Sequence, residues 1–340
     1  MRHPGPLLMF RSRVFTIWFI AALIVWIGLF ATFNSFEFLA SHWYYPAIMV
    51  LGAFVAGLTP EGGGAVAFPV LSVFFSIDRV LARDFSLMIQ SIGMTSASIY
   101  ILSLPGTDRR AFRPLLWLVP VCFGGFVVGM LTLQTIPVYI IQALFLSLIT
   151  TFAIAYVFGE HRGHEDQLRI RGASDRAFLT GIFFVGGLCA SLFGTGADII
   201  AYSLLVTRFR LKEKNATHMS IIVMASISVL GFGYRHFVDA GLTADQVRTW
   251  LCAYPVVLLM APFGTYILHR IHVDWMLKGI VLLNIGQLLY FNLNKPSTEK
   301  LVASVAFSAV LMLIFHLTMS RLARKKAAAT KLPLVIAEPS

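Results

Sequence analysis

The sequence predicts an all-α polytopic membrane protein with an inverted structural repeat: eight full transmembrane helices plus two broken-helix hairpins with glycine-rich tips. Three observations support this fold class. The 340 residues are 58% hydrophobic and 13% charged, whereas a soluble domain carries about 25% charge. Long charge-free runs alternate with short clusters of charge. Two apolar segments are too long for a single span and are interrupted by glycine and acidic residues.

The composition also excludes several classes of protein. The net charge of +11 lies in short clusters between apolar runs, which is typical of membrane-protein loops and not of a nucleic-acid-binding surface. Cys122, Cys189 and Cys252 lie inside apolar runs without zinc-site or disulfide spacing. No glycine-rich loop leads into Lys-Ser or Lys-Thr, so an ATP site is not expected. We therefore expect no metal, no cofactor and no nucleic-acid partner.

Eight runs have the composition of full spans, since about 20 apolar residues cross the hydrocarbon core as a helix. They are residues 14–33, 85–104, 114–133, 137–158, 216–234, 249–268, 275–293 and 301–320. The first follows Arg11 and Arg13, as in a signal peptide, but it is too long and lacks a small-residue cleavage site. We therefore keep it as a transmembrane helix.

The two broken segments are residues 43–76 and 177–207. Pro60 to Gly64 interrupt the first, and Gly194 to Asp198 interrupt the second. Either segment would be roughly 50 Å long as one helix, against a hydrocarbon core of about 30 Å. We interpret each as two half-helices that enter and leave by the same face and meet at a tip. Such a tip is tolerated at membrane depth only inside protein or beside a water-filled cavity.

The charge distribution tests this interpretation, because cytoplasmic loops carry an excess of Lys and Arg. With a cytoplasmic N-terminus and two hairpins, 21 of the 27 Lys and Arg residues lie on the cytoplasmic side. Single crossings would leave only 16 there. The sequence therefore predicts hairpins, cytoplasmic N- and C-termini, and a multi-pass protein of the cell inner membrane.

The two halves of the chain are similar at a shift of 134 residues, where nine of 35 positions are identical and Gly62 aligns with Gly196. Three spans separate the hairpins, so the second copy is inverted, which is typical of secondary transporters. The expected organisation is an N-terminal segment with the first helix (1–42), the first repeat (43–158), a cytoplasmic loop (159–176), the second repeat (177–293), and the last helix with a basic tail (294–340).

The broken segments resemble a known family. The motif GLTPEGGG at 57–64, followed by Pro69, is similar to the first glycine-rich signature of the sulfite exporter TauE/SafE family, and GTGAD at 194–198 is similar to its second copy. The resemblance covers residues 43–293. It implies transport of sulfite, sulfonates and related small sulfur anions.

The tips are candidate anion sites, because a half-helix start presents unpaired N–H groups and glycine lets a ligand approach the backbone. The candidate substrate-binding residues there are Gly62, Gly63, Gly64, Gly194, Thr195, Gly196 and Ala197. Gln90 and Ser91, on the span after the first hairpin, are further candidates. The alternative is that these small and polar residues serve helix packing.

Glu61 and Asp198 place carboxylates at both tips. A carboxylate at bilayer depth is costly and is therefore a functional candidate. Protonation would remove its repulsion of a bound anion and so couple protons to anion transport. The alternative role is to cap a half-helix, and both roles can coexist. His218 is a third coupling candidate, with an interfacial helix-start residue as its alternative.

These patterns predict a secondary transporter of sulfite, thiosulfate or organosulfonates, ion- or proton-coupled, with an elevator or rocking cycle. A passive anion channel is the alternative, and an intramembrane enzyme is a weaker one, because no matched constellation of catalytic groups exists. Expected partners are the small anion and membrane lipid; a homodimer stays an open alternative.

The charge split generates a test of topology. A cysteine placed in loop 105–113 and another in loop 208–214 should both be labelled by a membrane-impermeant reagent from the cytoplasmic side only. Labelling of the two loops from opposite sides would exclude the hairpins and the inverted repeat.

Overall fold

The computed structural model describes residues 6–158, 164–268 and 273–330, and within these ranges it is helical, with one isolated β-bridge between Glu165 and Leu211. Residues 159–163 of the expected cytoplasmic loop and 331–340 of the expected tail lie outside the described residues. The elements, with η for 3-10 or π-helical segments, are η1 (Pro6–Arg11), α1 (Arg13–Phe33), α2 (Phe36–Ser41), α3 (Tyr44–Leu58), α4 (Gly64–Pro69), η2 (Val70–Phe74), α5 (Arg79–Ser103), η3 (Arg109–Phe112), α6 (Leu115–Thr132), α7 (Val138–Phe158), α8 (Ala173–Phe193), α9 (Ala197–Thr207), α10 (Glu213–Gly233), η4 (Tyr234–Val238), α11 (Ala244–Leu268), α12 (Val273–Leu293) and α13 (Thr298–Thr330).

Both predicted breaks are present. The first hairpin consists of α3, which ends at Leu58, and a short second arm of α4 and η2 that begins at Gly64. In the second hairpin α8 ends at Phe193 and α9 begins at Ala197. Pro69 lies at the end of α4, where its missing N–H accompanies the change to the wider π-helical turn of η2.

Eight helices of the described chain are long and apolar enough to cross a membrane, which confirms the predicted all-α polytopic class. One of the eight differs from expectation. The first arm of the second hairpin, α8, starts at Ala173 and has 21 residues, a length of about 31 Å and not that of a half-helix. Its polar first turn is stabilised because Asp175 accepts from the Arg171 N–H and pairs with Arg208 at 2.9 Å. The expected span 275–293 lies in α12, but it is not one of the eight, because only Val281–Leu293 of the described part of α12 is found as an apolar helix and that stretch is shorter than a full span.

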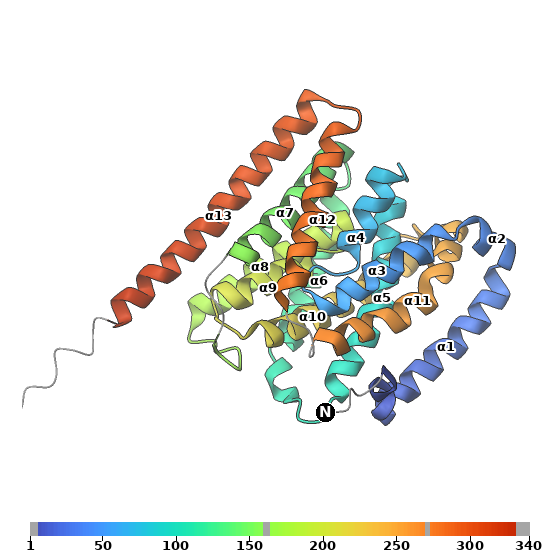
Figure 1. Cartoon of the computed structure of the whole chain (residues 1–340), viewed down its shortest axis with the longest axis horizontal. Coiled ribbons are helices and arrows are strands. Elements are labelled where there is room, and N and C mark those ends of the chain that lie inside the picture. The colour runs from blue at the N-terminus through green and yellow to red at the C-terminus, as the bar shows by residue number, and fades with distance from the viewer. Residues whose placement is uncertain (1–5, 159–163, 269–272, 331–340) are drawn as a thin grey trace, which may run out of the picture.

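The centre of the molecule is built from α5, α10 and α11, with α1 and α13 at opposite edges (Figure 1). Within its most apolar stretch, α5 has 78% of its residues buried, whereas α13 has 6%. A polar helix face at the centre contacts protein, and an apolar helix at the edge is suited to contact lipid. The candidate residue Gln90 lies on the buried central helix α5.

Two prolines in α11 create hydrogen-bonding needs that other helices meet. Pro255 and Pro262 have no N–H, so the carbonyls of Leu251 and Leu258, one turn earlier, lose their usual donors. Trp26 Nε1 of α1 donates to the Leu251 carbonyl at 2.8 Å, and the Ser96 hydroxyl of α5 donates to the Leu258 carbonyl at 3.0 Å. These bonds fix α11 between α1 and α5.

Glycines let the first arm of each hairpin, α3 or α8, approach another helix closely. Gly57 of α3 and Gly264 of α11 each face the other helix's backbone, where a Cβ would collide with the Ala261 and Phe54 carbonyls. Gly125 of α6 faces the Phe184 carbonyl of α8 in the same way. Both contacts are of the small-residue type that membrane helices use.

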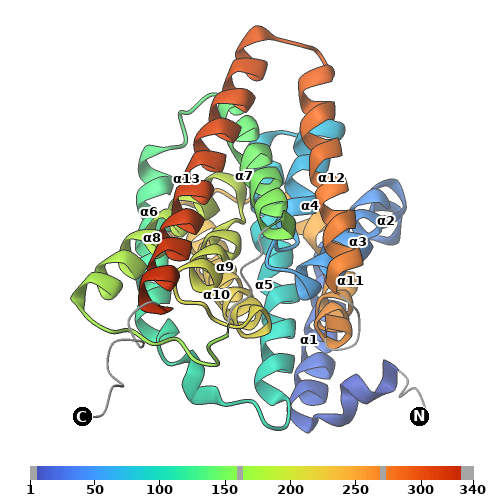
Figure 2. The same ribbon diagram turned by 60° about the vertical axis from the view of Figure 1, so that its left-hand side comes forward.

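A cavity of about 1000 Å³, which we call the vestibule, opens at one end of the molecule. The loop after α5, with Gly106 and Asp108, and the start of α10, with Lys214, both line it. In Figure 2 this end also holds η1 and the C-terminal end of α13. Loops 105–113 and 208–214 therefore lie at one end of the molecule, as the hairpin interpretation requires.

Candidate functional site

The two hairpin tips meet at one residue of the central helix. Gln90 Nε2 donates to the carbonyl of Gly194 at 2.8 Å and to that of Ser86, in its own helix, at 3.0 Å. These two bonds orient the amide, so that Gln90 Oε1 accepts a long bond of 3.4 Å from the Thr195 hydroxyl. Sequence reasoning singled out Gln90, and the fold places it between the tips.

Gly62 closes this group from the side of the first hairpin. It has a φ of +69°, a left-handed conformation that glycine adopts readily. A Cβ at Gly62 would collide with Asp198 Oδ2 and come within 2.8 Å of Gln90 Oε1 and 3.1 Å of Thr195 Oγ1. We call Gly62, Gln90, Thr195 and Asp198 the tip junction; its three polar side chains are at most 2% exposed.

The neighbouring glycines differ in how much space they have. A Cβ at Gly64 would come within 2.7 Å of Thr195 Cγ2, so this glycine also allows the tips to touch. Gly63 has a φ of −67°, and a Cβ there would meet Met49 at 3.4 Å and Ala56 at 3.6 Å, which are ordinary contacts. The conformational requirement for glycine therefore falls on Gly62 and not on Gly63.

Asp198 both caps a helix and leaves one oxygen over. Its Oδ1 accepts from the Gly196 N–H at 3.1 Å and the Ile199 N–H at 3.0 Å, at the start of α9. Gly196 has a φ of +101°. Asp198 Oδ2 is buried without a hydrogen-bond partner among the residues that the structure describes. The capping alternative thus accounts for one oxygen of this carboxylate.

Glu61 has a different environment. Both carboxylate oxygens accept from Asn284 Nδ2 of α12, at 3.0 and 3.2 Å. Asn284 also donates to the Ile149 carbonyl of α7 at 3.2 Å, so it fastens the first tip to α7 and α12. The sequence favoured a helix-packing role for Asn284 and Gln287, one turn apart, but did not connect Asn284 with Glu61.

The remaining candidates lie nearby or elsewhere. Ala197 is buried at the start of α9, against Gly186 of α8. The Ser91 hydroxyl donates to the Met88 carbonyl of its own helix at 2.7 Å. His218 lines the vestibule and is not part of the tip junction.

The tips are closed in this conformation. The cavity beside Gly63 and Gln90 has about 10 Å³, room for a single water-sized probe. Tyr100 lines the vestibule and lies ten residues along α5 from Gln90, roughly 15 Å. A ligand at the tips therefore requires the helices to separate.

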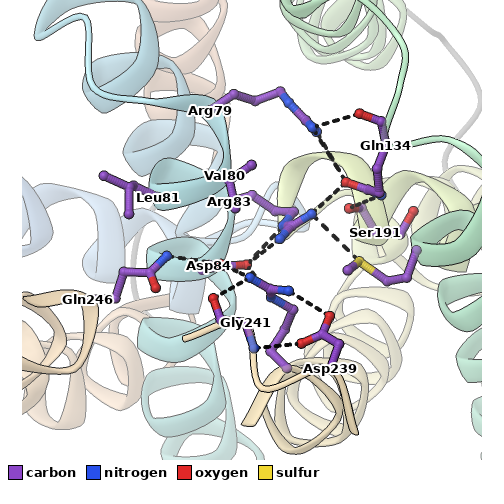
Figure 3. A network of polar contacts seen from close by, with 12 residues as sticks. Arg79, Val80, Leu81, Arg83, Asp84, Gln134, Ser191, Asp239, Gly241 and Gln246 are labelled. Atoms are coloured by element: carbon purple, nitrogen blue, oxygen red, sulfur yellow. Dashed lines mark hydrogen bonds and ion pairs between the residues drawn. The ribbon is translucent and has the colours of Figure 1, made fainter. Parts of the chain in front are cut away.

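The opposite end of α5 is closed by a buried network of charges (Figure 3). Arg235 Nη2 contacts Asp84 Oδ2 at 2.7 Å, and Arg83 Nη2 contacts Asp84 Oδ1 at 2.8 Å. Arg235 also binds Asp239 at 2.6 Å, and Gln246 Nε2 of α11 donates to Asp84 at 3.0 Å. The network joins α5 to η4 and α11.

A second branch of this network reaches α6 and α8. Gln134, in the turn between α6 and α7, accepts from Arg83 Nη1 at 2.6 Å. Its own amide donates to the Gly129 and Ser191 carbonyls at 3.0 and 3.3 Å. The charge count of the hairpin interpretation places Arg79, Arg83 and Arg235 among the six Lys and Arg residues on the non-cytoplasmic side. All three are buried, and Asp84, Asp239 and Gln134 bind them.

The described helices are those of a polytopic membrane protein. The family profile described as Sulfite exporter TauE/SafE matches residues 44–291, which is more than half of the sequence. The chain therefore belongs to the TauE/SafE family of membrane transporters and is not an enzyme, and the resemblance seen in the tip motifs is confirmed. No curated protein and no solved structure matches the chain.

The geometry of the first tip generates a paired prediction. Gly62→Ala should abolish anion-induced thermal stabilisation, because it imposes a positive φ on alanine and drives a methyl group into Asp198 and Gln90. Gly63→Ala should keep that stabilisation, since its methyl group meets only ordinary contacts. The measurement is the melting temperature with and without anion, and equal behaviour of the two variants would contradict the assignment.

Gly125→Val is the control for helix packing. Its side chain would separate α6 from α8, so the variant should melt at a lower temperature without anion while its anion-induced shift remains.

The charge network predicts a loss of stability. Asp84→Asn leaves Arg83 and Arg235 buried without their shared carboxylate, which should lower the unfolding free energy by about 3 kcal/mol or more. Asp166→Asn is the matched control, because its pair with Lys212 is solvent-exposed and such pairs contribute about 0–1 kcal/mol. Denaturation in detergent measures both, and equal stability of the two variants would contradict the prediction.

Proposed function

We propose that this protein is a secondary transporter of a small sulfur-containing anion, such as sulfite, thiosulfate or an organosulfonate, and that the anion binds between the two hairpin tips. The observation that carries the proposal is the meeting of both tips with Gln90 inside the helical core. Family membership supports the class of substrate.

The start of α9 supports an anion site. Its N-terminal N–H groups and the helix dipole favour negative charge, and Gly194 and Gly196 keep side chains away from the backbone. The Gly62–Gly64 backbone lies directly against Thr195 on the facing tip. We propose Gly62, Gly63, Gly64, Gln90, Ser91, Gly194, Thr195, Gly196 and Ala197 as the residues around the bound anion, and Glu61, Asp198 and His218 as candidate coupling groups.

The two ends of α5 support an alternating-access cycle. The vestibule lets water and solutes reach the molecule from one end, whereas the Asp84 network closes the other. We propose that the protein lies in the cell inner membrane and that the vestibule faces the cytoplasm. The N- and C-termini lie on the same side. The charge network is then the outer gate, and rocking of the two repeats alternately opens each end.

Thermal shifts of the purified protein test the substrate class. We expect sulfite, thiosulfate, taurine or sulfoacetate to raise the melting temperature, and acetate at the same concentration to leave it unchanged. A shift with carboxylates alone would contradict the proposed substrate class.

Transport separates a carrier from a passive channel. In proteoliposomes a carrier shows saturable counterflow of the stabilising anion, because one site is exposed alternately to each side, whereas a channel shows none. Gln90→Leu should weaken transport at least tenfold, since the tips lose their shared amide, a loss of roughly 1–3 kcal/mol. Gln142→Leu is the control, because Gln142 is a buried glutamine that bonds the Ser72 carbonyl outside the tips. Counterflow that is unchanged in Gln90→Leu would move the site away from the tips.

A further inference from the structure

We propose that Asp198, and not Glu61, is the protonatable coupling carboxyl of this transporter, and that its Oδ2 carries the proton at the tip junction. The inference deepens the proposed function and rests on it. It follows from the different hydrogen-bond environments of the two carboxyl groups at the tips.

The oxygens of Asp198 face different kinds of groups. Oδ1 accepts two backbone N–H bonds at the start of α9, so it needs no proton. Oδ2 has no hydrogen-bond partner among the described residues and faces Gly62, whose added Cβ would also come within 2.8 Å of Gln90 Oε1 and 3.1 Å of Thr195 Oγ1. The Thr195 hydroxyl hydrogen is directed to Gln90 Oε1, and Gln90 Nε2 is bonded to two carbonyls.

A carboxylate oxygen among acceptors, away from water, is strongly disfavoured. Asp198 is 0% exposed, so solvent does not compensate for the missing donor. A proton on Oδ2 removes the buried charge and turns this oxygen from an acceptor without a donor into a donor. The geometry thus favours the neutral acid in the closed conformation.

The groups around Asp198 do not supply a balancing positive charge. The titratable side chains that act on it are Glu61 from the first tip and Cys122 from α6, with Cys189 of α8 beside Gly196. On α5 the nearest charged residues, Arg83 and Asp84, bind each other. On α10, His218 lines the vestibule.

Glu61 has the donors that Asp198 Oδ2 lacks. Asn284 Nδ2 donates to both Glu61 oxygens and also to the Ile149 carbonyl, so each Glu61 oxygen has a hydrogen-bond partner in the closed conformation. Glu61 is therefore a positioning residue that fastens the first tip to α12 and α7.

Coupling follows from charge. An anion at the start of α9 is repelled by an ionised Asp198 and accepted beside a neutral one. One proton on Oδ2 would accompany each anion, and Oδ2 would exchange this proton with water only when the tips open.

Asp198→Asn separates this role from capping. The amide oxygen of asparagine can keep the two N–H bonds of Oδ1, and its NH₂ group replaces the proton of the neutral acid at Oδ2. The variant should therefore fold and bind anion as the protonated wild type does.

The first experiment needs no anion. Infrared spectroscopy of the purified protein should show the carbonyl band of a protonated carboxyl at neutral pH. Asp198→Asn should lose this band, and Glu61→Gln should keep it. Loss of the band in Glu61→Gln with retention in Asp198→Asn would overturn the assignment, and so would its absence from the wild type.

The second experiment measures thiosulfate affinity against pH, because the charge of thiosulfate is constant around neutrality. As the pH rises through the range in which Asp198 loses its proton, wild-type affinity for thiosulfate should fall by up to about tenfold per pH unit, as expected for one linked proton. Asp198→Asn should bind with no such slope, and the exposed variant Asp166→Asn should keep it. A wild-type slope in Asp198→Asn would overturn the proposal.

Two further outcomes are distinct. If anion affinity is higher in Na⁺ than in choline, and Asp198→Asn loses this difference, the coupling ion at these oxygens is sodium and the proton proposal is overturned. Failure of every tested sulfur anion to bind at any pH would refute the proposed function, while the infrared result would still decide which carboxyl holds a proton.

Discussion

A helix that breaks inside an apolar environment leaves backbone N–H and C=O groups without partners, and the arrangement of this protein depends on how those groups are satisfied. The carbonyl of Gly194 receives the Gln90 amide, and two N–H groups at the start of α9 receive Asp198 Oδ1. The Glu61 N–H is bonded by the Thr59 hydroxyl at 3.3 Å. The polar side chains that stabilise the breaks therefore gather at the point where a ligand can use the same backbone groups.

The central helix α5 connects this point to both ends of the molecule. Asp84 lies six residues from Gln90, roughly 9 Å along the helix, within a network that joins η4 and α11. In the other direction α5 reaches the vestibule at Tyr100. A buried charge pair is stable only while both partners stay in contact, because one partner alone is an uncompensated buried charge. Separation of η4 from α5 would expose the charges to water, which makes this end a candidate gate.

The close helix crossings support the proposed inverted repeat. At the shift of 134 residues α3 corresponds to α8, and α6 corresponds to α11. The structure pairs α3 with α11 and α8 with α6 through glycines such as Gly57 and Gly125. Each hairpin thus packs on a helix of the other half, as a two-fold relation between the halves would require.

The sequence by itself determined the helical membrane class and the positions of both breaks, because hydropathy and glycine runs are local signals, and it singled out Gln90 as a candidate. It did not determine that the first tip needs a left-handed backbone at Gly62, that α8 is full-length, or that Asn284 holds Glu61. It also suggested loop positions for Arg83 and Arg235, which the structure buries. Only the tertiary structure decided these points, because each depends on groups far apart in the chain: Asp84 and Arg235 are separated by 151 residues, and Glu61 and Asn284 by 223. A charge is stable at membrane depth only with its partner, and no local pattern names that partner.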